Sequence, residues 1–479
     1  MTQPGPAASP GPAASPSPAP GAVLPVALDG GVRVLDGGRV LLGGDPGRLV
    51  RLTSGGASAL DRLSTGAGSS GPARHLARAL IAGGLAHPRP LPAPALDVTV
   101  VVPVRDRTGE LARCLAALGP EVPVLVVDDG SRDPAAVAAV CRAYGAGVRH
   151  LAVNGGPAAA RNAGLAASGS AYVAFVDSDC APPPGWLPAL LGHFGDPYVG
   201  AVAPRVRGSA GGRTVLGRYA AARGPLDMGS REASVRPGGR VPYIPSAALV
   251  VRRSALPGGR AFDPALRYGE DVDLVWRLGD AGCSVRYDPR TVVPHAEPDR
   301  WGAWLARRYR YGTSAAPLAL RHGSRLAPLV VPPWPTAAWL LLLGRRPLPA
   351  LAAAAVPAVR LHRRLRRSGL TKATCARVSA TSAARGVVAT GAGLGGAGSV
   401  VTGPLLLALL LPSRTRAAAA AALLAPPLLE WADRRPALDP VRWSAVRLLD
   451  DLAYAAGVWR GCWTGRTTTP LRPRTSRPA

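Results

Sequence analysis

The chain has 479 residues, enough for two or three domains, and its 57 Lys and Arg against 29 Asp and Glu give a formal net charge of +28. This excess indicates a polyanionic partner, such as nucleic acid, anionic lipid or a phosphorylated substrate. The six cysteines contain no C-x-x-C pair, which disfavours a zinc site and a disulfide framework, and we expect no secretory signal because no basic segment precedes an apolar one at the start.

The first part of the chain predicts a tail followed by a small unit. Residues 1–22 are rich in Pro and Ala and predict a disordered tail. Residues 23–92 predict an α+β unit with strands at 32–35, 39–42 and 48–52, and then two helices. Three short strands followed by helices resemble the winged-helix peptide-recognition domains of systems that modify ribosomal peptides. A packing or dimerisation domain is an equally good reading. We expect no nucleic-acid partner, because the arginines do not cluster on the second helix.

Residues 96–312 change to the pattern of an α/β domain. Apolar β-rich runs at 98–104, 122–127, 148–153 and 172–176 alternate with helical patterns at 110–118, 133–143 and 158–167. This alternation predicts a doubly wound, mostly parallel sheet.

Two carboxylates follow the run Tyr172–Val176, where open α/β sheets bind ligands. Asp177 and Asp179 supply hard oxygen donors, which suit Mg²⁺ or Mn²⁺, and such a cation holds diphosphate. A second acidic pair, Glu270 and Asp271, precedes an amphipathic helical pattern and suggests a catalytic base. Each pair also has a plain structural reading, as a strand-end cap or as acids at a helix N-terminus.

Five motifs in order resemble family 2 glycosyltransferases with the GT-A fold: VVVPVRD, VVDDGSRD, NGGPAAARNAGLA, AYVAFVDSD and YGEDVDLVWRL. The match runs from Leu96 to His295. The front unit, the basic apolar tail and the ending LDDLAYAAGVW resemble more narrowly the mycofactocin-system glycosyltransferases of actinobacteria.

The resemblance implies roles for individual residues. The metal ligands would be Asp179, with Asp177 beside it, and His295 as a third, although a buried histidine is more often a hydrogen-bonded core residue. Contacts to the nucleotide-sugar would come from Pro103, Arg105, Asp129, Asp177 and Arg161. Asp271 would be the catalytic base, and Glu270 would orient the acceptor.

The implied reaction is inverting transfer of a hexose, glucose from UDP-glucose, onto a peptide-derived redox cofactor precursor. A short β-1,4-linked glucan is compatible with it. Processive relatives carry a Gln-x-x-Arg-Trp motif, whereas this chain has Arg307-Arg308-Tyr309-Arg310-Tyr311, which disfavours long processive synthesis.

Residues 313–479 predict an apolar, basic helical region. From Arg300 to Leu429 the chain has 18 Lys and Arg and no Asp or Glu. Prolines interrupt two of its apolar runs, and none reaches the roughly 20 residues that a bilayer requires. We expect helices lying on an anionic membrane surface, which would attach a cytoplasmic enzyme to the inner face of the cell membrane. A soluble Ala-rich helical domain is the alternative.

Three other functions use the same features. The first is a family 2 glycosyltransferase with a lipid or cell-envelope glycan as acceptor. The second is a nucleotidyltransferase, although its usual Gly-rich loop and lysine are replaced here by Pro103-Val-Arg. The third is a non-catalytic scaffold with a basic tail, which would not need Asp179 and Asp271 together.

Overall fold

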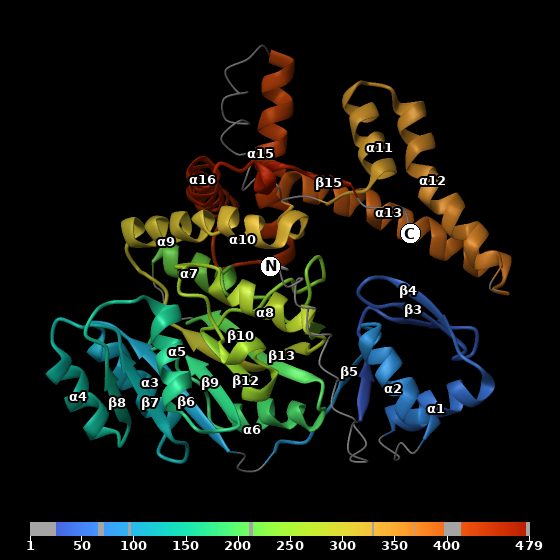
Figure 1. Ribbon diagram of the computed structural model, residues 1–479. Coiled ribbons are helices and arrows are strands. Elements are labelled where there is room, and N and C mark those ends of the chain that lie inside the picture. Colours follow the sequence, from blue (N-terminus) through green and yellow to red (C-terminus); the bar gives the residue numbers. More distant parts are fainter. Residues whose placement is uncertain are drawn as a thin grey trace, which may run out of the picture.

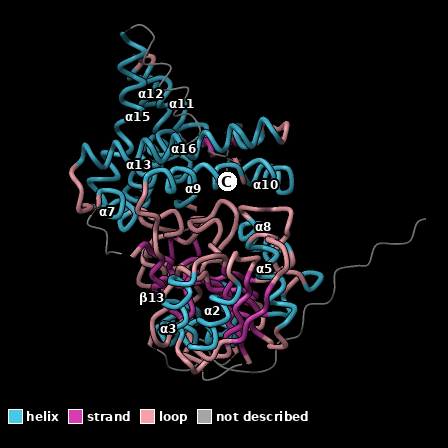
Figure 2. The backbone as a smooth tube through the Cα atoms, turned by 90° about the vertical axis from the view of Figure 1, so that its left-hand side faces the viewer, coloured by secondary structure: helices cyan, strands magenta, loops and turns pink. Residues whose placement is uncertain are grey.

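The computed structural model describes residues 25–65, 71–93, 97–209, 214–327, 330–367, 369–396 and 413–475. The expected tail, 1–22, lies outside them. A small N-terminal unit stands beside a larger α/β domain, and the C-terminal helices gather along one side of that domain (Figure 1). The view turned by 90° shows the same division between a strand-rich half and a helical half (Figure 2).

The N-terminal unit is a small α+β fold. Its elements are β1 (Val26–Leu28), β2 (Arg33–Leu35), β3 (Val40–Gly43), β4 (Arg48–Arg51), α1 (Ser54–Ser64), α2 (Pro72–Ala82) and β5 (Ala86–Pro88). Strands β2, β3 and β4 form an antiparallel sheet, and β1 pairs with β5. The Thr53 hydroxyl accepts a hydrogen bond from the Gly56 amide and so caps α1. Leu41, Leu60 and Leu80 lie in its core.

Ion pairs join this unit to residues 231–240 of the larger domain. Buried Asp29 accepts hydrogen bonds from Arg240 at 2.6 Å and from Arg231 at 3.1 Å. Arg89 donates two hydrogen bonds to Glu232, each 2.6 Å long. A bidentate arginine–carboxylate pair fixes orientation as well as distance. These pairs therefore hold the N-terminal unit in a fixed orientation against the larger domain.

The larger domain is built on an eight-stranded sheet in the order β11-β13-β10-β12-β9-β6-β7-β8. Its strands are β6 (Val98–Val104), β7 (Val124–Asp128), β8 (Gly147–His150), β9 (Tyr172–Val176), β10 (Val199–Gly208), β11 (Ala233–Ser234), β12 (Ala248–Arg252) and β13 (Ser284–His295). Strands β9, β6, β7 and β8 are parallel, as predicted. Strand β12 runs antiparallel between β9 and β10, a feature that the sequence pattern did not indicate.

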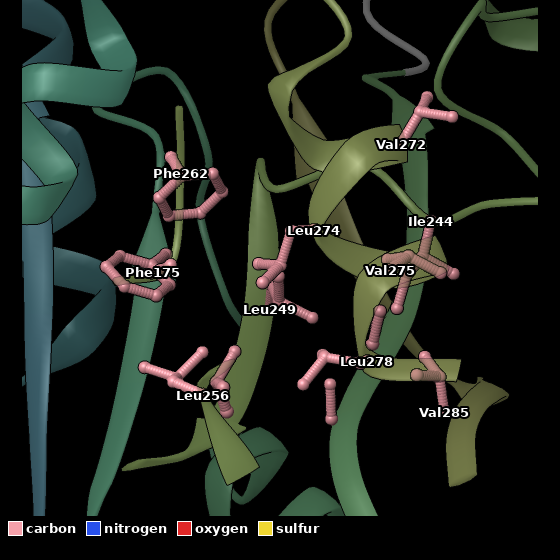
Figure 3. Packing of buried hydrophobic residues seen from close by; sticks show 14 of the residues in the cluster. Phe175, Ile244, Leu249, Leu256, Phe262, Val272, Leu274, Val275, Leu278 and Val285 are labelled. Atoms are coloured by element: carbon pink, nitrogen blue, oxygen red, sulfur yellow. The ribbon is translucent and has the colours of Figure 1, made fainter. Parts of the chain in front are cut away.

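Helices cover both faces of this sheet. They are α3 (Thr108–Leu118), α4 (Pro134–Ala143), α5 (Pro157–Ala167), α6 (Trp186–Leu191), α7 (Val215–Ala222) and α8 (Glu270–Asp280). Side chains of α3, α4 and α6 form one core layer. Side chains of α5 and α8 form the other, where Phe175 and Phe262 meet edge to face at 5.0 Å (Figure 3). The doubly wound arrangement is thus confirmed, and it places the strand ends of β6, β7 and β9 along one edge.

The C-terminal region is helical. Its elements are α9 (Trp301–Thr313), α10 (Ala315–His322), β14 (Val330–Val331), α11 (Pro333–Leu343), α12 (Pro347–Arg366), α13 (Lys372–Gly396), α15 (Ser413–Arg434), α16 (Pro440–Thr464) and β15 (Arg474–Thr475). Helices α9 and α10 lie between the sheet domain and the rest of this region (Figures 1 and 2). Side chains of α12 and α13, including Leu365 and Val378, cover Val40 of the N-terminal sheet.

Helix α16 crosses α9 at very short range. Gly312 of α9 and Gly457 of α16 both lie against backbone of the opposite helix, where a Cβ atom would clash. Beside this crossing, Trp443 of α16 is fully buried against Tyr219 and near Trp304. The C-terminal helix is therefore part of the body that carries the sheet.

The structure describes only part of the region in which membrane-associated helices are expected. No helix in the described ranges combines the length and hydropathy needed to cross a bilayer. The apolar run Val400–Leu411 lies outside those ranges. Leucines on the outer helices are nevertheless exposed, among them Leu340, Leu348 and Leu429.

Candidate active site

A large cavity of about 1610 Å³ opens at the carboxyl ends of the parallel strands. Every residue that the sequence singled out lines it: Pro103, Arg105, Asp129, Arg161, Asp177, Asp179, Glu270, Asp271 and His295. They come from the ends of β6, β7, β9 and β13 and from the starts of α5 and α8. The topology therefore collects in one space residues that are far apart in the chain.

Arg161 is the centre of a buried ion network. Its guanidinium donates to Asp177 at 2.6 Å and to Glu270 at 2.8 Å, and it lies over the ring of Phe262. Although burial would lower the pKa of Arg161, Asp177 and Glu270 hold that pKa above its ordinary value. Arg161 thus links the acid after β9 to the acids of α8 and fixes their spacing.

Asp179 lies in a second network. Arg107 donates to its Oδ2 at 3.1 Å, and Nε2 of His295 lies 3.3 Å from its Oδ1. His295 also contacts Glu297 through Nδ1 at 3.1 Å, and Glu297 pairs with Arg307. Burial would raise the pKa of Asp179, but His295, Arg107 and Arg307 hold that pKa below its ordinary value, so the carboxylate stays charged.

Asp179 has the donor atom that a divalent cation requires. Its Oδ1 is buried and makes no hydrogen bond of suitable geometry, despite the nearby histidine. A charged, under-coordinated carboxylate oxygen beside a cavity fits Mg²⁺ or Mn²⁺. The full expected ligand set is not assembled: Asp177 faces Arg161, and among the described residues no three His, Cys, Asp or Glu side chains are grouped to hold a metal ion. The ligand set stays a prediction.

Asp271 and Glu270 begin α8 behind Gly269, whose φ of 81° suits glycine. One Asp271 oxygen accepts from the Val272 amide at 2.8 Å and the other from the Ser246 amide at 3.3 Å. Burial raises the pKa of Asp271 above its ordinary value, against the Val272 amide and Arg161. A carboxylate with a raised pKa at a cavity wall suits a general base.

Glu270 is almost fully buried. Burial and the neighbouring Asp271 raise the pKa of Glu270 to about 7, against the attraction of Arg161. The hydrogen bond from Arg161 favours the charged form of Glu270, but Arg161 also donates to Asp177. Burial therefore has the larger effect on the pKa of Glu270. Glu270 therefore has a structural role in this network besides any contact to an acceptor.

Three further expected nucleotide contacts, Asp129, Pro103 and Arg105, also line the cavity. Asp129 is buried, and its two carboxylate oxygens accept the amides of Gly155 and Gly156, each at 2.8 Å. Pro103 is the penultimate residue of β6, and Arg105 is exposed just after this strand. Asp128 accepts a hydrogen bond from the Ser131 amide and contacts His150. The base-reading roles themselves stay predictions.

Several residues of the cavity were missed by the sequence reasoning. Arg107 lies two residues after Arg105, and Glu297 lies two residues after His295. Both could have been predicted from these neighbours. Tyr243, Tyr311 and Tyr454 form a further wall, and Arg308 lies over the Tyr454 ring at 5.4 Å. Tyr454 belongs to the motif LDDLAYAAGVW, but no role was predicted for it, because the crossing of α16 over α9 brings it to the site.

Comparison with known proteins agrees with this geometry. Residues 99–257 match the Glycosyl transferase family 2 profile. The chain is 40% identical over 473 residues to the Pre-mycofactocin glycosyltransferase of Mycobacterium tuberculosis, covering 94% of this chain and 97% of that protein. It is 30% identical over 247 residues to an N-acetylglucosaminyltransferase of Rhizobium meliloti, covering 47% and 56% respectively.

Among solved structures, a Pyrobaculum calidifontis mannosyltransferase in complex with GDP-Man and Mn²⁺ matches with a TM-score of 0.46 and 19% identity. That match covers 78% of this chain and 90% of the other.

Proposed function

The chain belongs to the family 2 glycosyltransferases, a nucleotide-sugar-dependent class with the GT-A fold, and we propose that it glycosylates a peptide-derived redox cofactor precursor in mycofactocin biosynthesis. The donor we propose is UDP-glucose. What supports the acceptor is the 40% identity to the Pre-mycofactocin glycosyltransferase along almost the whole of both chains. The likeness includes the N-terminal unit and the C-terminal helices, which a general family 2 enzyme would not need to share.

The observation that supports the chemistry is that Asp271, Asp177 and Asp179 line one cavity. In the proposed transfer, an acceptor hydroxyl oxygen bonds to the anomeric carbon of the donor. The carbon–oxygen bond to the diphosphate breaks, and the nucleoside diphosphate leaves with that electron pair. Asp271 takes the hydroxyl proton, so a single displacement inverts the anomeric carbon.

The remaining residues bind and orient. Asp179 would hold Mg²⁺ or Mn²⁺, whose chemistry at this place is a counter-charge for the leaving diphosphate. Arg161 fixes Asp177 and Glu270, and thereby the start of α8 and its Asp271. Asp129, Pro103 and Arg105 would contact the base of the nucleotide.

The N-terminal unit would help to present the acceptor. Its Asp29 and Arg89 hold residues 231–240, and Pro237, Gly238 and Gly239 from this segment line the cavity. A peptide-derived acceptor bound by the unit would therefore be close to the segment that shapes the acceptor side. This arrangement supports a recognition role without requiring the unit to contact the reacting atoms.

The test is mass spectrometry of the precursor incubated with purified protein, UDP-glucose and Mn²⁺ or Mg²⁺. We expect mass increments of one hexose, and further increments if a short β-1,4-linked glucan is built. Loss of the increments with EDTA, and their return with added cation, would support the metal assignment. Absence of hexose transfer from UDP-glucose under all these conditions would overturn the proposed donor and acceptor.

We propose further that the outer C-terminal helices attach the enzyme to the cytoplasmic face of an anionic membrane. Leu348 and Leu351 of α12 are 80% and 69% exposed, and the arginine cluster Arg363, Arg364, Arg366 and Arg367 ends the same region. Each basic residue near such a surface adds about 1 kcal/mol before screening. Binding to phosphatidylglycerol vesicles at low salt, but not to phosphatidylcholine vesicles, is the expected result. The absence of binding to both kinds of vesicle would refute the proposal.

A further inference from the structure

A second cavity, of about 340 Å³, adjoins the large one. Four residues line both: Pro225, Tyr243, Arg308 and Tyr454. We propose that this junction is an acceptor subsite for a sugar residue that the acceptor already carries. The proposal rests on the proposed function, which it extends by stating what the enzyme binds after its first transfer.

Each arginine that lines the second cavity is already paired with a carboxylate. Arg223 pairs with Glu430 and Asp450, Arg308 with Asp450, and Arg434 with Glu430. Arg447 pairs with Glu430 and Asp451. A phosphate or a lipid diphosphate would have to compete with these carboxylates, so the lining favours a neutral polar ligand.

The tyrosine hydroxyls at the junction can form hydrogen bonds to a ligand. In the described part of the chain, the hydroxyls of Tyr243 and Tyr454 make no hydrogen bond. A tyrosine hydroxyl both donates and accepts, and a ligand rich in hydroxyls matches that capacity. The rings supply apolar faces for the C–H side of a sugar, whereas a purely apolar ligand would leave the polar groups without partners.

The subsite lies next to the proposed base. Tyr243, Tyr454 and Asp271 line the same cavity. A sugar resting between Tyr243 and Tyr454 would present a hydroxyl towards Asp271. The product of one transfer would thus be positioned as the acceptor of the next.

The crossing of α16 over α9 sets the position of Tyr454. Gly312 and Gly457 allow α16 to lie directly on α9. On the preceding turn, Asp450 accepts hydrogen bonds from the Tyr219 hydroxyl at 3.1 Å and from Arg223 at 2.7 Å. Among the described residues, Arg308 stacks on the Tyr454 ring and the Tyr454 hydroxyl makes no hydrogen bond, so this hydroxyl is available to a ligand.

The experiment measures cellobiose binding to the full-length protein in the presence of UDP and Mn²⁺, by titration calorimetry. Tyr454→Ala removes ring and hydroxyl and should weaken cellobiose binding by about tenfold or more. Tyr454→Phe retains the ring and should weaken it by about fivefold, the share of one hydrogen bond. Trp463→Ala, at a side chain 80% exposed on the same helix, should leave it unchanged.

UDP binding, measured in the same proteins, separates a local effect from misfolding. Unchanged UDP affinity in all variants, together with the graded loss of cellobiose binding, supports the subsite. Failure of the wild-type protein to bind cellobiose, or equal cellobiose affinity in Tyr454→Ala, overturns it. The proposed function fails independently, through absent transfer from UDP-glucose to the precursor.

Discussion

Gly312 of α9 lies so close to the carbonyl oxygen of Tyr454 on α16 that a methyl group has no room between them. This contact makes the C-terminal helix a wall of the active-site cavity, because Tyr454 and Val458 both line it. A region that the sequence presented as a basic, apolar appendage therefore contributes directly to the site.

The first prediction concerns this helix crossing. Gly312→Ala should destabilise the protein by about 1–3 kcal/mol, because overpacking forces the two helices apart. Gly302→Ala is the matched control on the same helix, since its Cβ would meet nothing within 4 Å. That variant should gain roughly 0.5–1 kcal/mol from reduced backbone freedom. Denaturant unfolding of both proteins measures the difference, and equal stability would contradict the close contact.

The second prediction concerns Asp179. Asp179→Ala removes the under-coordinated oxygen and should abolish transfer and weaken Mn²⁺-dependent UDP binding. Asp61→Ala, at an exposed position of α1, controls for loss of a carboxylate elsewhere. Calorimetry with and without Mn²⁺ gives the measurement. A fully active Asp179→Ala protein would remove this residue from the metal site.

The third prediction concerns the base. Asp271→Asn keeps the shape of the side chain and removes its basicity, and its single amide oxygen can keep one of the two hydrogen bonds that the Val272 and Ser246 amides donate. Turnover should fall by about 10²–10⁴-fold, the usual size of general-base catalysis, with little change in UDP binding. Steady-state kinetics checks this, and an unchanged kcat would transfer the role to another group.

The fourth prediction is a pH dependence of stability at Glu270. Its pKa is raised from an ordinary 4.5 to about 7 in the fold, so between these values the folded protein binds more protons than the unfolded chain. The free energy of unfolding should therefore fall as pH rises through this window, by at most roughly 3 kcal/mol. Thermal unfolding from pH 4.5 to 7.5 measures the slope. Glu270→Gln, which mimics the protonated form, should flatten it, and an identical slope in the variant would refute the assignment.

The fifth prediction concerns the N-terminal unit. Asp29→Asn removes the charge that Arg240 and Arg231 share, and it should loosen residues 231–240. The acceptor KM should then rise while hydrolysis of the donor is spared. Asp36→Asn in the turn between β2 and β3 is the control. Unaltered acceptor kinetics in Asp29→Asn would indicate that the unit serves another purpose.

The local elements around the site could be read from the sequence alone. The apolar run Tyr172–Val176 forms β9 with the same bounds, and the acids after it line the cavity. Such runs are readable because burial on both faces of a parallel strand demands continuous apolar side chains. The sequence motifs that form α5 and α8 likewise indicated Arg161, Glu270 and Asp271.

Other features were decided by the tertiary structure. Strand β12 inserts antiparallel between β9 and β10, and Arg161 joins Asp177 to Glu270, because folding brings together segments whose partners leave no mark in the local pattern. The same holds for Tyr454. Its place in the cavity that Asp271 also lines depends on the close approach of Gly312 to α16. The sequence by itself thus determined which strand end or helix carries each predicted site residue, through burial and spacing along single elements. Only the packed molecule determined which of them face one another, since those distances are set by contacts between remote segments.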